Sequence, residues 1–526
     1  MKKNKLFLLG FAPLYILSLA GCNLFPSQNA SSSDPFDDMF NSSSSEGKDS
    51  SSSTSYTDEE INDPNMALAN SDEYLNFWNP STELKLEINM SSESANFMNT
   101  YQTNHDDSTY HDYYVPCNVS LTINGNKQTF EEVGIRCKGN MSRQTFLNDG
   151  HFTENKLSHF KLSFKETFDD DEYSTIEQLQ QFKKTWEDDS ARKKRKKRTL
   201  FDMEKIDIKW NRNDDTTKSK QAYALKTFRD NGALAGNATL ANTYLSVGND
   251  TPINVTYEVL ETIDDVFIKR HFNTTKSKGD LYKCTYTDKG PANFSASSVI
   301  GKEDNTIGYH PSYDLKTNKK TSDHSSLKNL INVMNRNSLS ASEYKTEIEK
   351  VMDMNYFMKY ESIAYLLGNF DDMRNNANNY YLYFTSATNI AYVIPYDFDR
   401  CLGAGCEGRK NFMTDFAPES TKMQCNGAWQ TINIYWRTIC ASSDSNSGHT
   451  NIERVEAYRA LYEKNIKDIL NSQTFSTTSF TSFVNSFPSI YRGDPTGSGN
   501  DNTTFENYFN KKVAKIKEFY PSGINI

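Results

Sequence analysis

The chain has 526 residues, a formal net charge of −10 and a pI of about 5.5. Aromatic residues make up 13% of the sequence, which excludes a wholly disordered chain because such chains are poor in aromatic side chains. The length suggests about two to four domains, or one large domain with insertions. The acidic balance argues against a general nucleic-acid-binding protein.

The first 21 residues are typical of an export signal. Lys2, Lys3 and Lys5 precede an apolar stretch of 16 residues, which is short for a membrane span. The stretch ends in Leu-Ala-Gly before Cys22 and resembles the bacterial lipobox, in which the cysteine left by cleavage becomes lipid-modified. An ordinary signal with an incidental cysteine is the alternative. No later segment has 18 consecutive apolar residues, so we expect no later transmembrane helix. From the lipobox we expect an exported protein that is anchored to a membrane by a lipid at Cys22.

Residues 22–75 are expected to form a disordered tether between this anchor and the folded body. Within them, 13 of the 29 residues at 27–55 are serine. Such a segment cannot bury enough apolar surface to offset the entropy lost on ordering.

Eight cysteines are present, and seven remain when Cys22 is set aside, so at least one is unpaired within a monomer. Cys401 with Cys406, or Cys425 with Cys440, are the local disulfide candidates, and the connectivity stays open. The sequence contains no Cys-x-x-Cys pair and no cluster of histidines at ligand spacing, so we expect no zinc site.

The folded part is expected to start near residue 76 and to be rich in strands at first. Alternating apolar residues predict strands at 84–88, 119–123, 130–137 and 160–164. Asn124-Gly125 predicts a hairpin turn. Residues 169–198 are acidic and then basic, and we expect an insertion there. Its basic run, 192–198, is either a solvated segment or a site for an acidic partner.

Helical patterns become more frequent further along the chain. We expect helices at 218–233, near 267, and at 326–336, 341–367, 452–471 and 503–519. We expect strands at 240–247, 254–261, 281–283, 380–384 and 390–396. A β-rich N-terminal part followed by a helical C-terminal part predicts an α+β fold.

The densest group of polar side chains flanks the expected hairpin at 380–396. Asp371 and Asn379 precede the hairpin, and Asp397 and Asp399 follow it. Because an antiparallel hairpin returns its ends to one place, we expect the four side chains to meet. Hard oxygen ligands suit Mg²⁺ or Mn²⁺, and one carboxylate can also accept a proton from an attacking hydroxyl. The alternative is a capped helix followed by an Asn-rich turn.

The same order of residues occurs in protein kinases, where a base Asp and a metal-binding Asn precede a hairpin and a metal-binding Asp follows it. The ordinary kinase signatures, namely the Gly-x-Gly-x-x-Gly loop, Val-Ala-Ile-Lys and His-Arg-Asp, are absent, and so is a P-loop. Over roughly residues 80–470 the sequence instead resembles the CotH-type kinases, atypical protein-kinase-like proteins first associated with bacterial spore coats.

The resemblance rests on five blocks in the family's order. They are Val133 to Ser142, Phe160 to Lys165, Tyr257 to Asp264, Leu281 to Lys283, and Asn369 to Asp399, the last being the longest and most specific. Three features depart from the family: the glycine expected before Tyr257 is missing, Phe370 replaces the usual tryptophan, and the 169–198 insertion separates two blocks. These departures affect fold detail more than the carboxylates.

The resemblance implies an atypical protein-kinase-like fold at 76–475, followed by a helical extension at 476–526. It implies transfer of the γ-phosphoryl group of ATP to protein Ser or Thr hydroxyls with Mg²⁺ or Mn²⁺. Asp371 would then be the catalytic base and Asp397 the principal metal ligand. The further metal ligands implied are Asn379 and Asp399. The residues implied in ATP binding are Arg136, Lys138, Lys161, Glu261 as the partner of Lys161, and Lys283.

Two functions from different classes stay open. The first is an active kinase, and the second is a non-catalytic surface or spore-coat lipoprotein that uses the same scaffold for adhesion or assembly. The scarcity of ATP outside cells favours the second, and the retained carboxylates favour the first. The expected partners are ATP, a protein substrate that includes the Ser-rich tether itself, and a membrane reached through the lipid, but no nucleic acid.

Overall fold

The computed structural model describes residues 70–104, 107–139, 142–212, 214–336, 338–374, 377–403, 422–425, 428–431, 455–499 and 503–520. All of them belong to the unit Ser53–Ile526. The export signal, Cys22, the serine-rich segment, Cys406 and Cys440 lie outside the described residues.

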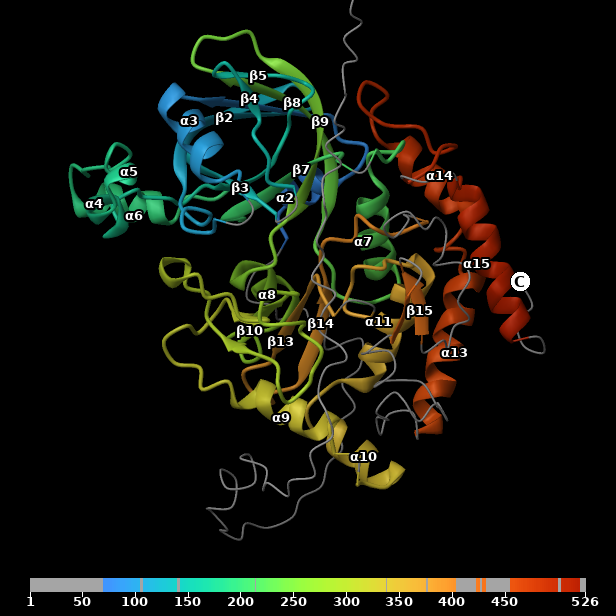
Figure 1. Ribbon diagram of the computed structural model, residues 1–526. Helices are drawn as coiled ribbons and strands as arrows, with labels where there is room; N and C mark the ends of the chain where they lie inside the picture. Colours follow the sequence, from blue (N-terminus) through green and yellow to red (C-terminus); the bar gives the residue numbers. More distant parts are fainter. Residues whose placement is uncertain are drawn as a thin grey trace, which may run out of the picture. The chain divides into compact units, whose positions relative to one another are not determined.

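Seven strands close into a barrel, drawn in blue to light green at the top of Figure 1, in the order β1-β2-β3-β6-β7-β9-β8. They are β1 (Leu84–Met90), β2 (Val115–Ile123), β3 (Asn126–Lys138), β6 (His159–Ser163), β7 (Lys205–Trp210), β8 (Ala238–Val247) and β9 (Ile253–Glu261). Residues such as Leu86, Ile135 and Ile208 form the apolar core of the barrel. Because side chains alternate along a strand, the neighbours of these residues point away from that core. On β3, β6, β7 and β9 these outward positions carry the candidate site.

The expected turn between β2 and β3 is confirmed. Ile123 pairs with Asn126, and Asn124 and Gly125 have φ angles of 47° and 87°. Two central residues with positive φ are characteristic of a type I′ hairpin turn, for which Asn-Gly is favoured. The helices α2 (Asp72–Trp78) and α3 (Ser92–Tyr101) were not predicted, nor were β7 and the small hairpin of β4 (Leu147–Asn148) and β5 (His151–Phe152).

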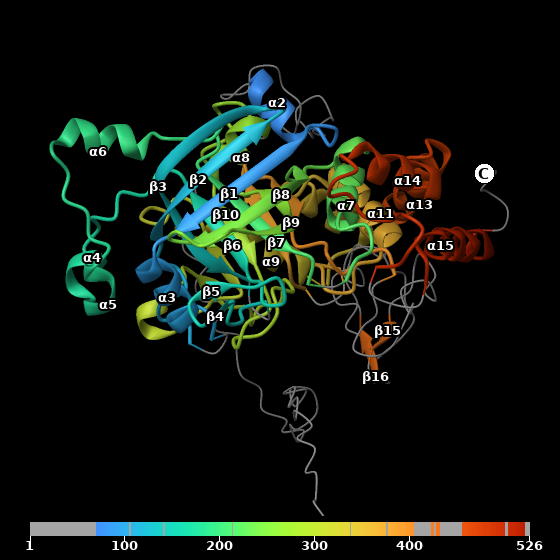
Figure 2. The ribbon, with the colours of Figure 1, turned by 90° about the horizontal axis from the view of Figure 1, so that it is seen from above.

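The expected insertion contains α4 (Glu172–Thr175), α5 (Glu177–Gln180) and α6 (Asp189–Lys196), which project from the barrel beside β3 in Figure 2. Arg192 pairs with Asp169 at the start of the insertion, and Arg195 attaches the insertion to the barrel by pairing with Glu132 on β3 at 2.8 Å. Arg198 donates to backbone carbonyls of the barrel strands and their ends. The basic run is therefore partly structural, and its solvated part consists of Lys193, Lys194, Lys196 and Lys197.

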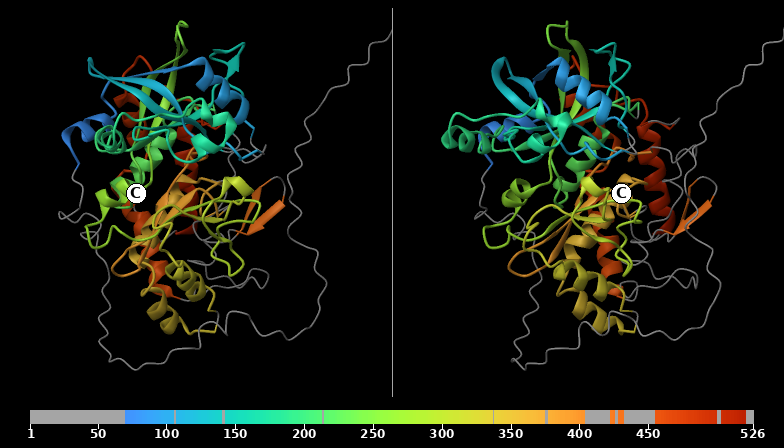
Figure 3. Two further views of the ribbon diagram at one scale, coloured as in Figure 1. Left: turned by 90° about the vertical axis from the view of Figure 1, so that its left-hand side faces the viewer. Right: turned by 60° about the vertical axis from the view of Figure 1, so that its left-hand side comes forward.

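A second sheet lies below the barrel in Figures 1 and 3, with strand order β11-β12-β10-β13-β14. Its strands are β10 (Leu281–Cys284), β11 (Ile300–Gly301), β12 (Tyr313–Leu315), β13 (Tyr380–Phe384) and β14 (Ala391–Pro395). The helices of this part are α7 (Lys220–Asp230), α8 (Asp265–His271), η2 (Asn305–Ile307), α9 (Ser325–Met334), α10 (Ala341–Ile348), α11 (Met354–Leu367), α13 (Glu456–Asn471), α14 (Thr477–Ser486) and α15 (Phe505–Phe519). A separate hairpin pairs β15 (Lys422–Cys425) with β16 (Ala428–Thr431). The fold is thus a mixture of strands and helices, as expected, although the part expected to be helical also holds a five-stranded sheet.

The prediction of a single helix at 341–367 is wrong, because the chain forms two helices there. Asp353 accepts a hydrogen bond from the backbone N–H of Tyr356 and so caps a new helix start at α11. Val351 and Met352, between the two helices, are buried like the helical positions around them. The apolar pattern of the sequence therefore continues across the break between α10 and α11, and the N-cap residue Asp353 marks where the second helix begins.

The last helices belong to the same apolar core as the second sheet. Phe480, Tyr508 and Ile516 are buried in the cluster that contains α11. The hydroxyl of Tyr508 donates to the carbonyl of Leu366 at 2.8 Å, close to the end of α11. Within the described residues, no helix is both long and apolar enough to cross a membrane.

Four cysteines in the described part, Cys117, Cys137, Cys284 and Cys401, are buried free thiols. The candidate disulfide from Cys401 is therefore wrong. Its Sγ instead approaches the carbonyl of Lys220 at 3.9 Å, within the core that joins α7 to the loop after β14.

Candidate active site

The hairpin of β13 and β14 brings the backbone of its two flanks together. The N–H of Tyr396 donates to the carbonyl of Asn379 at 3.2 Å across the base of the hairpin. Asn369 then connects the two flanks, since its Nδ2 donates to the carbonyl of Asp397 at 3.4 Å and its Oδ1 accepts from the N–H of Asp371 at 3.0 Å. The loop before the hairpin is thereby held against the loop after it.

Asp371 is oriented by side-chain amides. Its Oδ1 accepts a hydrogen bond from Asn378 and its Oδ2 accepts one from Asn379, both at 3.0 Å. A carboxylate has about four lone-pair positions, so it can still accept a further hydrogen bond from a substrate hydroxyl. The Nδ2 of Asn379 also donates to the backbone carbonyl of Asp371 at 2.9 Å. The Oδ1 of Asn379 is the atom left to serve as a metal ligand.

Asp397 and Asp399 converge on one cation, the buried ammonium of Lys209 on β7. Lys209 Nζ contacts Asp397 Oδ1, and it lies 3.0 Å from Asp399 Oδ2. Burial acts to raise the pKa of the Asp397 carboxyl, but Lys209 and Lys138 hold it well below its usual range. Asp397 is therefore an anion at neutral pH. The left-handed φ angles of Asn379 (54°) and Asp397 (55°) mark the same two positions as strained, which is common at functional sites.

A second group of charges lies beside this one, on β3, β6 and β7. The strand register places Arg136 opposite Lys161, and Lys161 opposite Asp207. The buried carboxylate of Asp207 lies 3.2 Å from Lys161 Nζ and 3.5 Å from Lys138 Nζ. Two lysines therefore share one carboxylate in this group.

Tyr396 links the barrel lysines to the second sheet. Lys138 Nζ lies 4.9 Å from the centre of its ring, and Lys283 Nζ, from β10, lies 5.6 Å from it. Burial lowers the pKa of Lys283, and the neighbouring Lys316 lowers it further. Burial also lowers the pKa of Lys161, to about 8, although Asp207 opposes this shift. An anionic ligand stabilises the charged form of a buried lysine, so lysines with lowered pKa values are suited to binding such a ligand.

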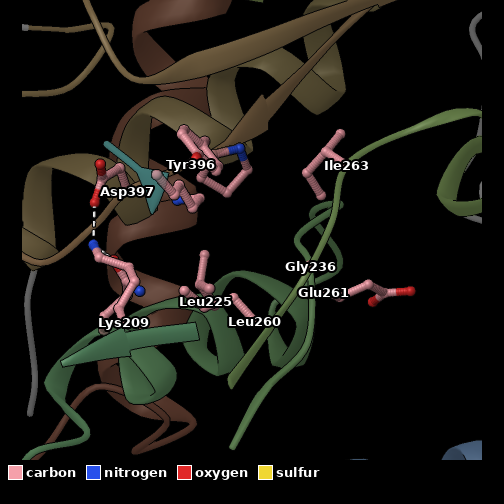
Figure 4. Close-up of a pocket in the computed structure, with 11 residues that line it drawn as sticks. Lys209, Leu225, Gly236, Leu260, Glu261, Ile263, Tyr396 and Asp397 are labelled. Carbon is pink, nitrogen blue, oxygen red and sulfur yellow. Dashed lines mark hydrogen bonds and ion pairs between the residues drawn. The ribbon is translucent and has the colours of Figure 1, made fainter. Parts of the chain in front are cut away.

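The pocket at this place encloses about 300 Å³ of empty space, part of which is open solvent. Figure 4 shows Lys209 and Asp397 joined on one side, with Tyr396 beside Asp397, Leu225 and Leu260 between the two sides, and Ile263 on the far side. The pocket therefore has charged groups at one side and apolar side chains at the other, as ligand sites commonly have.

The expected pair of Lys161 with Glu261 is not formed. The carboxylate of Glu261 points away from Lys209 and Asp397 in Figure 4. It accepts from the hydroxyl of Tyr74 at 2.6 Å and from the N–H of Asn237 at 3.0 Å. Glu261 thus holds α2 and the start of β8 together, and Asp207 takes its place as the partner of Lys161.

Arg136 also has a different environment from the other expected ligands. Its guanidinium donates to the carbonyl of His111 at 2.9 Å and pairs with Asp112 at 3.3 Å, and it lies over the ring of Tyr114. These contacts fix the loop before β2. They leave Lys138, Lys161 and Lys283 as the expected cations nearest to the pocket.

Sequence reasoning missed Lys209 and Asp207. The segment Lys205 to Trp210 alternates charged and apolar residues, which is a strand signal. Lys209 and Asp207 share the outward face of β7, and a charged face normally indicates solvent. Here that face is covered, because Lys209 is 4% exposed and Asp207 only 1%.

The donor set fits a divalent cation. Asp397 and Asp399 offer carboxylate oxygens that already converge on a positive charge, the ammonium of Lys209. Hard oxygen ligands of this kind are those that Mg²⁺ prefers. Asn379 is tied instead to Asp371, whose Oδ2 accepts a hydrogen bond from its side-chain amide.

The chain is similar to known proteins in sequence and, weakly, in structure. Over 196 residues the chain is 24% identical to the inner spore coat protein H of Bacillus subtilis (strain 168), an alignment that covers 37% of this chain and 49% of that protein. The chain therefore spans about half the length of that relative. The solved structure of the Helicobacter pylori proinflammatory kinase CtkA matches 60% of this chain and 88% of its own, at 12% identity and a TM-score of 0.29. At this TM-score no residue role rests on the match.

The family model described as CotH kinase protein matches residues 153–522. This range includes β6, β7, the hairpin of β13 and β14, and the last helices α14 and α15. It therefore contains Lys161, Lys209, Asp371, Asp397 and Asp399. The chain belongs to the CotH kinase protein family.

Proposed function

We propose that this chain is an atypical protein kinase that transfers the γ-phosphoryl group of ATP, bound with Mg²⁺, to serine or threonine hydroxyls of a protein. The observation that carries the proposal is a group of three lysines next to Asp397: Lys138 and Lys283 lie over the ring of Tyr396, and Lys161 shares the carboxylate of Asp207 with Lys138. Lysines with lowered pKa values favour a ligand with several negative charges, and a triphosphate is such a ligand. Membership of the CotH kinase protein family supports the same reading.

The bound Mg²⁺ would supply positive charge to the transferred phosphoryl group. Asp397 and Asp399 would hold the cation. Lys138 and Lys161 would bind the phosphate oxygens and keep them in place. Asp371, which two amides orient, would accept a hydrogen bond from the acceptor hydroxyl and take its proton. Transfer of this kind depends mainly on positioning and on stabilising charge, and these residues provide both.

One observation favours a second candidate, a non-catalytic scaffold at the cell surface or in a spore coat. Lys209 already neutralises both Asp397 and Asp399. In a protein that never binds a metal, the ion pairs of Lys209 with Asp397 and Asp399 would balance the charge of these carboxylates permanently. Binding of ATP with Mg²⁺ therefore distinguishes the two candidates, because the scaffold needs neither.

Thermal unfolding with ATP and Mg²⁺ tests this binding. A ligand at 100 times its Kd stabilises the native state by about 2.7 kcal/mol. We expect wild type to be stabilised, Lys138→Met to lose most of the effect, and the exposed Lys193→Met on α6 to behave as wild type. Absence of stabilisation in wild type would contradict ATP binding and favour the scaffold.

We further propose that the protein is exported, carries a lipid at Cys22 and acts at a cell surface or spore coat. The name of the Bacillus subtilis relative, inner spore coat protein H, supports the surface or coat location. The serine-rich segment 27–55 would be either a spacer or the nearest phosphate acceptor, because a tethered segment has a high effective concentration. Mass spectrometry after incubation with ATP and Mg²⁺, with Asp371→Ala as control, separates these two roles. Phosphate on this segment that depends on Asp371 supports the acceptor role.

A further inference from the structure

We propose that a second pocket, which adjoins the first at Lys209, binds an acidic group of the protein segment that carries the acceptor hydroxyl. The proposal deepens the kinase function above and rests on it. It predicts that the substrates are sequences in which a carboxylate or phosphate group lies within a few residues of the serine or threonine.

The second pocket encloses about 400 Å³ of empty space, part of which is open solvent. It shares Lys209 and Gln221 with the first pocket, and Asp399 also lines it. One of its sides is the segment between β7 and α7, which contributes Arg212 and Lys218. The pocket is therefore next to the carboxylates at which the phosphoryl group would be transferred.

Two cations of this pocket have no carboxylate partner among the described residues. Burial lowers the pKa of Lys218, and its Nζ donates to the hydroxyl of Thr256 at 3.3 Å. Its φ of 59° is in the left-handed region, so the backbone holds this lysine in an unfavourable conformation. Arg212 is exposed at the edge of the pocket. Such cations favour an anion that enters from solution.

The acidic side chains of the pocket do not offset these cations. Burial raises the pKa of Glu258 to about 8, so Glu258 is mostly protonated and neutral at pH 7. Its Oε2 accepts from Gln221 Nε2 at 2.8 Å, and its Oε1 is buried without a hydrogen-bond partner in the described structure. A protonated carboxyl group can donate a hydrogen bond, so Glu258 adds a donor for an anion.

The two remaining carboxylates are already bound. Asp215 accepts hydrogen bonds from the backbone N–H of Thr217 at 2.9 Å and of Lys220 at 3.0 Å, at the start of α7. Asp399 is paired with Lys209. Lys220 Nζ, the remaining cation of the pocket, donates to the carbonyl of Gly499 at 3.0 Å. Four cations line the pocket together with the carboxylates of Asp215 and Asp399, and Lys209 also pairs with Asp397, which lies outside the pocket. With Glu258 neutral, four cations face three carboxylates, and the balance is positive.

The nucleotide has a different set of cations available. Lys138 lines the first pocket, and Lys161 and Lys283 lie near it, whereas none of the three lines the second pocket. An anion in the second pocket would therefore belong to the other reactant, the acceptor segment. Its position beside Asp399 would place an acidic side chain of that segment within a few residues of the reacting hydroxyl.

Binding of fluorescently labelled peptides tests the proposal without requiring turnover. The probe has the sequence of residues 42–53, which contains eight serines with Glu46 and Asp49 between them. A neutral probe has Gln and Asn at these two positions, and a third probe has phosphoserine in place of Glu46. The proteins are the full chain, Lys218→Met, the double variant Arg212→Met with Lys218→Met, and the control Lys226→Met on the exposed side of α7.

We expect the double variant to bind the acidic probe about five- to tenfold more weakly than wild type, and the neutral probe with unchanged affinity. Lys226→Met should behave as wild type. Tighter binding of the phosphoserine probe than of the Glu46 probe assigns the pocket to phosphate, and the reverse order assigns it to carboxylate. Equal weakening for acidic and neutral probes would overturn the proposal.

Affinity for ATP with Mg²⁺ is measured on the same variants and should not change. A loss of ATP affinity in Lys218→Met would overturn the proposal, because the pocket would then belong to the nucleotide. Transfer assays separate the failure of this inference from that of the kinase function. If the peptides are phosphorylated without preference for the acidic one, the acidic subsite is contradicted and the kinase function is not. If no peptide is phosphorylated, the kinase function itself is contradicted.

Discussion

The amine of Lys161 should make ATP binding depend on pH. This lysine is buried on β6, and burial lowers its pKa to about 8 against the opposing effect of Asp207. The neighbouring Arg136, Lys205 and Lys138 contribute to the lowering. In the free protein a substantial fraction of Lys161 is therefore uncharged at pH 8 and above.

A triphosphate beside this amine would stabilise its charged form and raise its pKa toward the ordinary value of about 10.4. A group whose pKa rises on binding takes up protons, so binding weakens as the pH rises above the pKa of the free protein. With a free-state pKa of about 8, the uptake is about half a proton at pH 8 and about a tenth of a proton at pH 7. The affinity should therefore fall about tenfold, or about 1.4 kcal/mol, between pH 7 and pH 9.

Isothermal titration of the full chain with ATP and Mg²⁺ at pH 7, 8 and 9 measures this change. Two buffers of different ionisation enthalpy report the proton uptake directly. Lys161→Met should bind more weakly and lose the tenfold pH dependence, and Lys161→Arg should lose only the pH dependence, because arginine stays charged. A Lys161→Met variant with the slope of wild type would refute the assignment of the titration to this amine.

Four further predictions concern single residues. Asp397→Asn should abolish binding of ATP with Mg²⁺ while circular dichroism stays unchanged, and unchanged affinity in the folded variant would remove it as a metal ligand. Asp371→Asn should keep ATP binding but lower kcat with little change in KM, and retained turnover would exclude it as the base. Gly139→Ala should lower Tm by more than Gly125→Ala. Both glycines have positive φ, so an alanine at either position costs about 1–2 kcal/mol of backbone strain. Of the two, only Gly139 would also place its new Cβ against a side-chain oxygen, that of Ser142 at 2.0 Å. A Tm loss that is equal in the two variants would contradict that contact. Cys22→Ser should prevent lipid attachment, and fractionation identical to wild type would mean that Cys22 is incidental.

The sequence predicted the elements whose signals are local. The alternation at 84–88, the Asn-Gly turn and the polar flanks of the hairpin at 380–396 each depend on neighbouring residues, and the structure has all three. The polar flanks meet because hairpin geometry requires it, whatever the rest of the fold does.

The partners of the charged residues could not be predicted in the same way. Lys161 meets Asp207 through the register of two strands separated by the 169–198 insertion, and Lys209 meets Asp397 from a different sheet. Glu261 has the spacing of a lysine partner, yet α2 supplies Tyr74 as its partner instead. Such contacts depend on which strands pair and on which face of the sheet is buried, and a local sequence pattern predicts neither.

The full chain incubated with γ-labelled ATP, Mg²⁺ and a serine-containing protein or peptide tests the kinase assignment most directly. Asp371→Asn and Asp397→Asn, each verified as folded, are the matched controls. We expect label on serine or threonine with wild type and none with either variant. No label with wild type, or equal label with wild type and both variants, would contradict the kinase assignment.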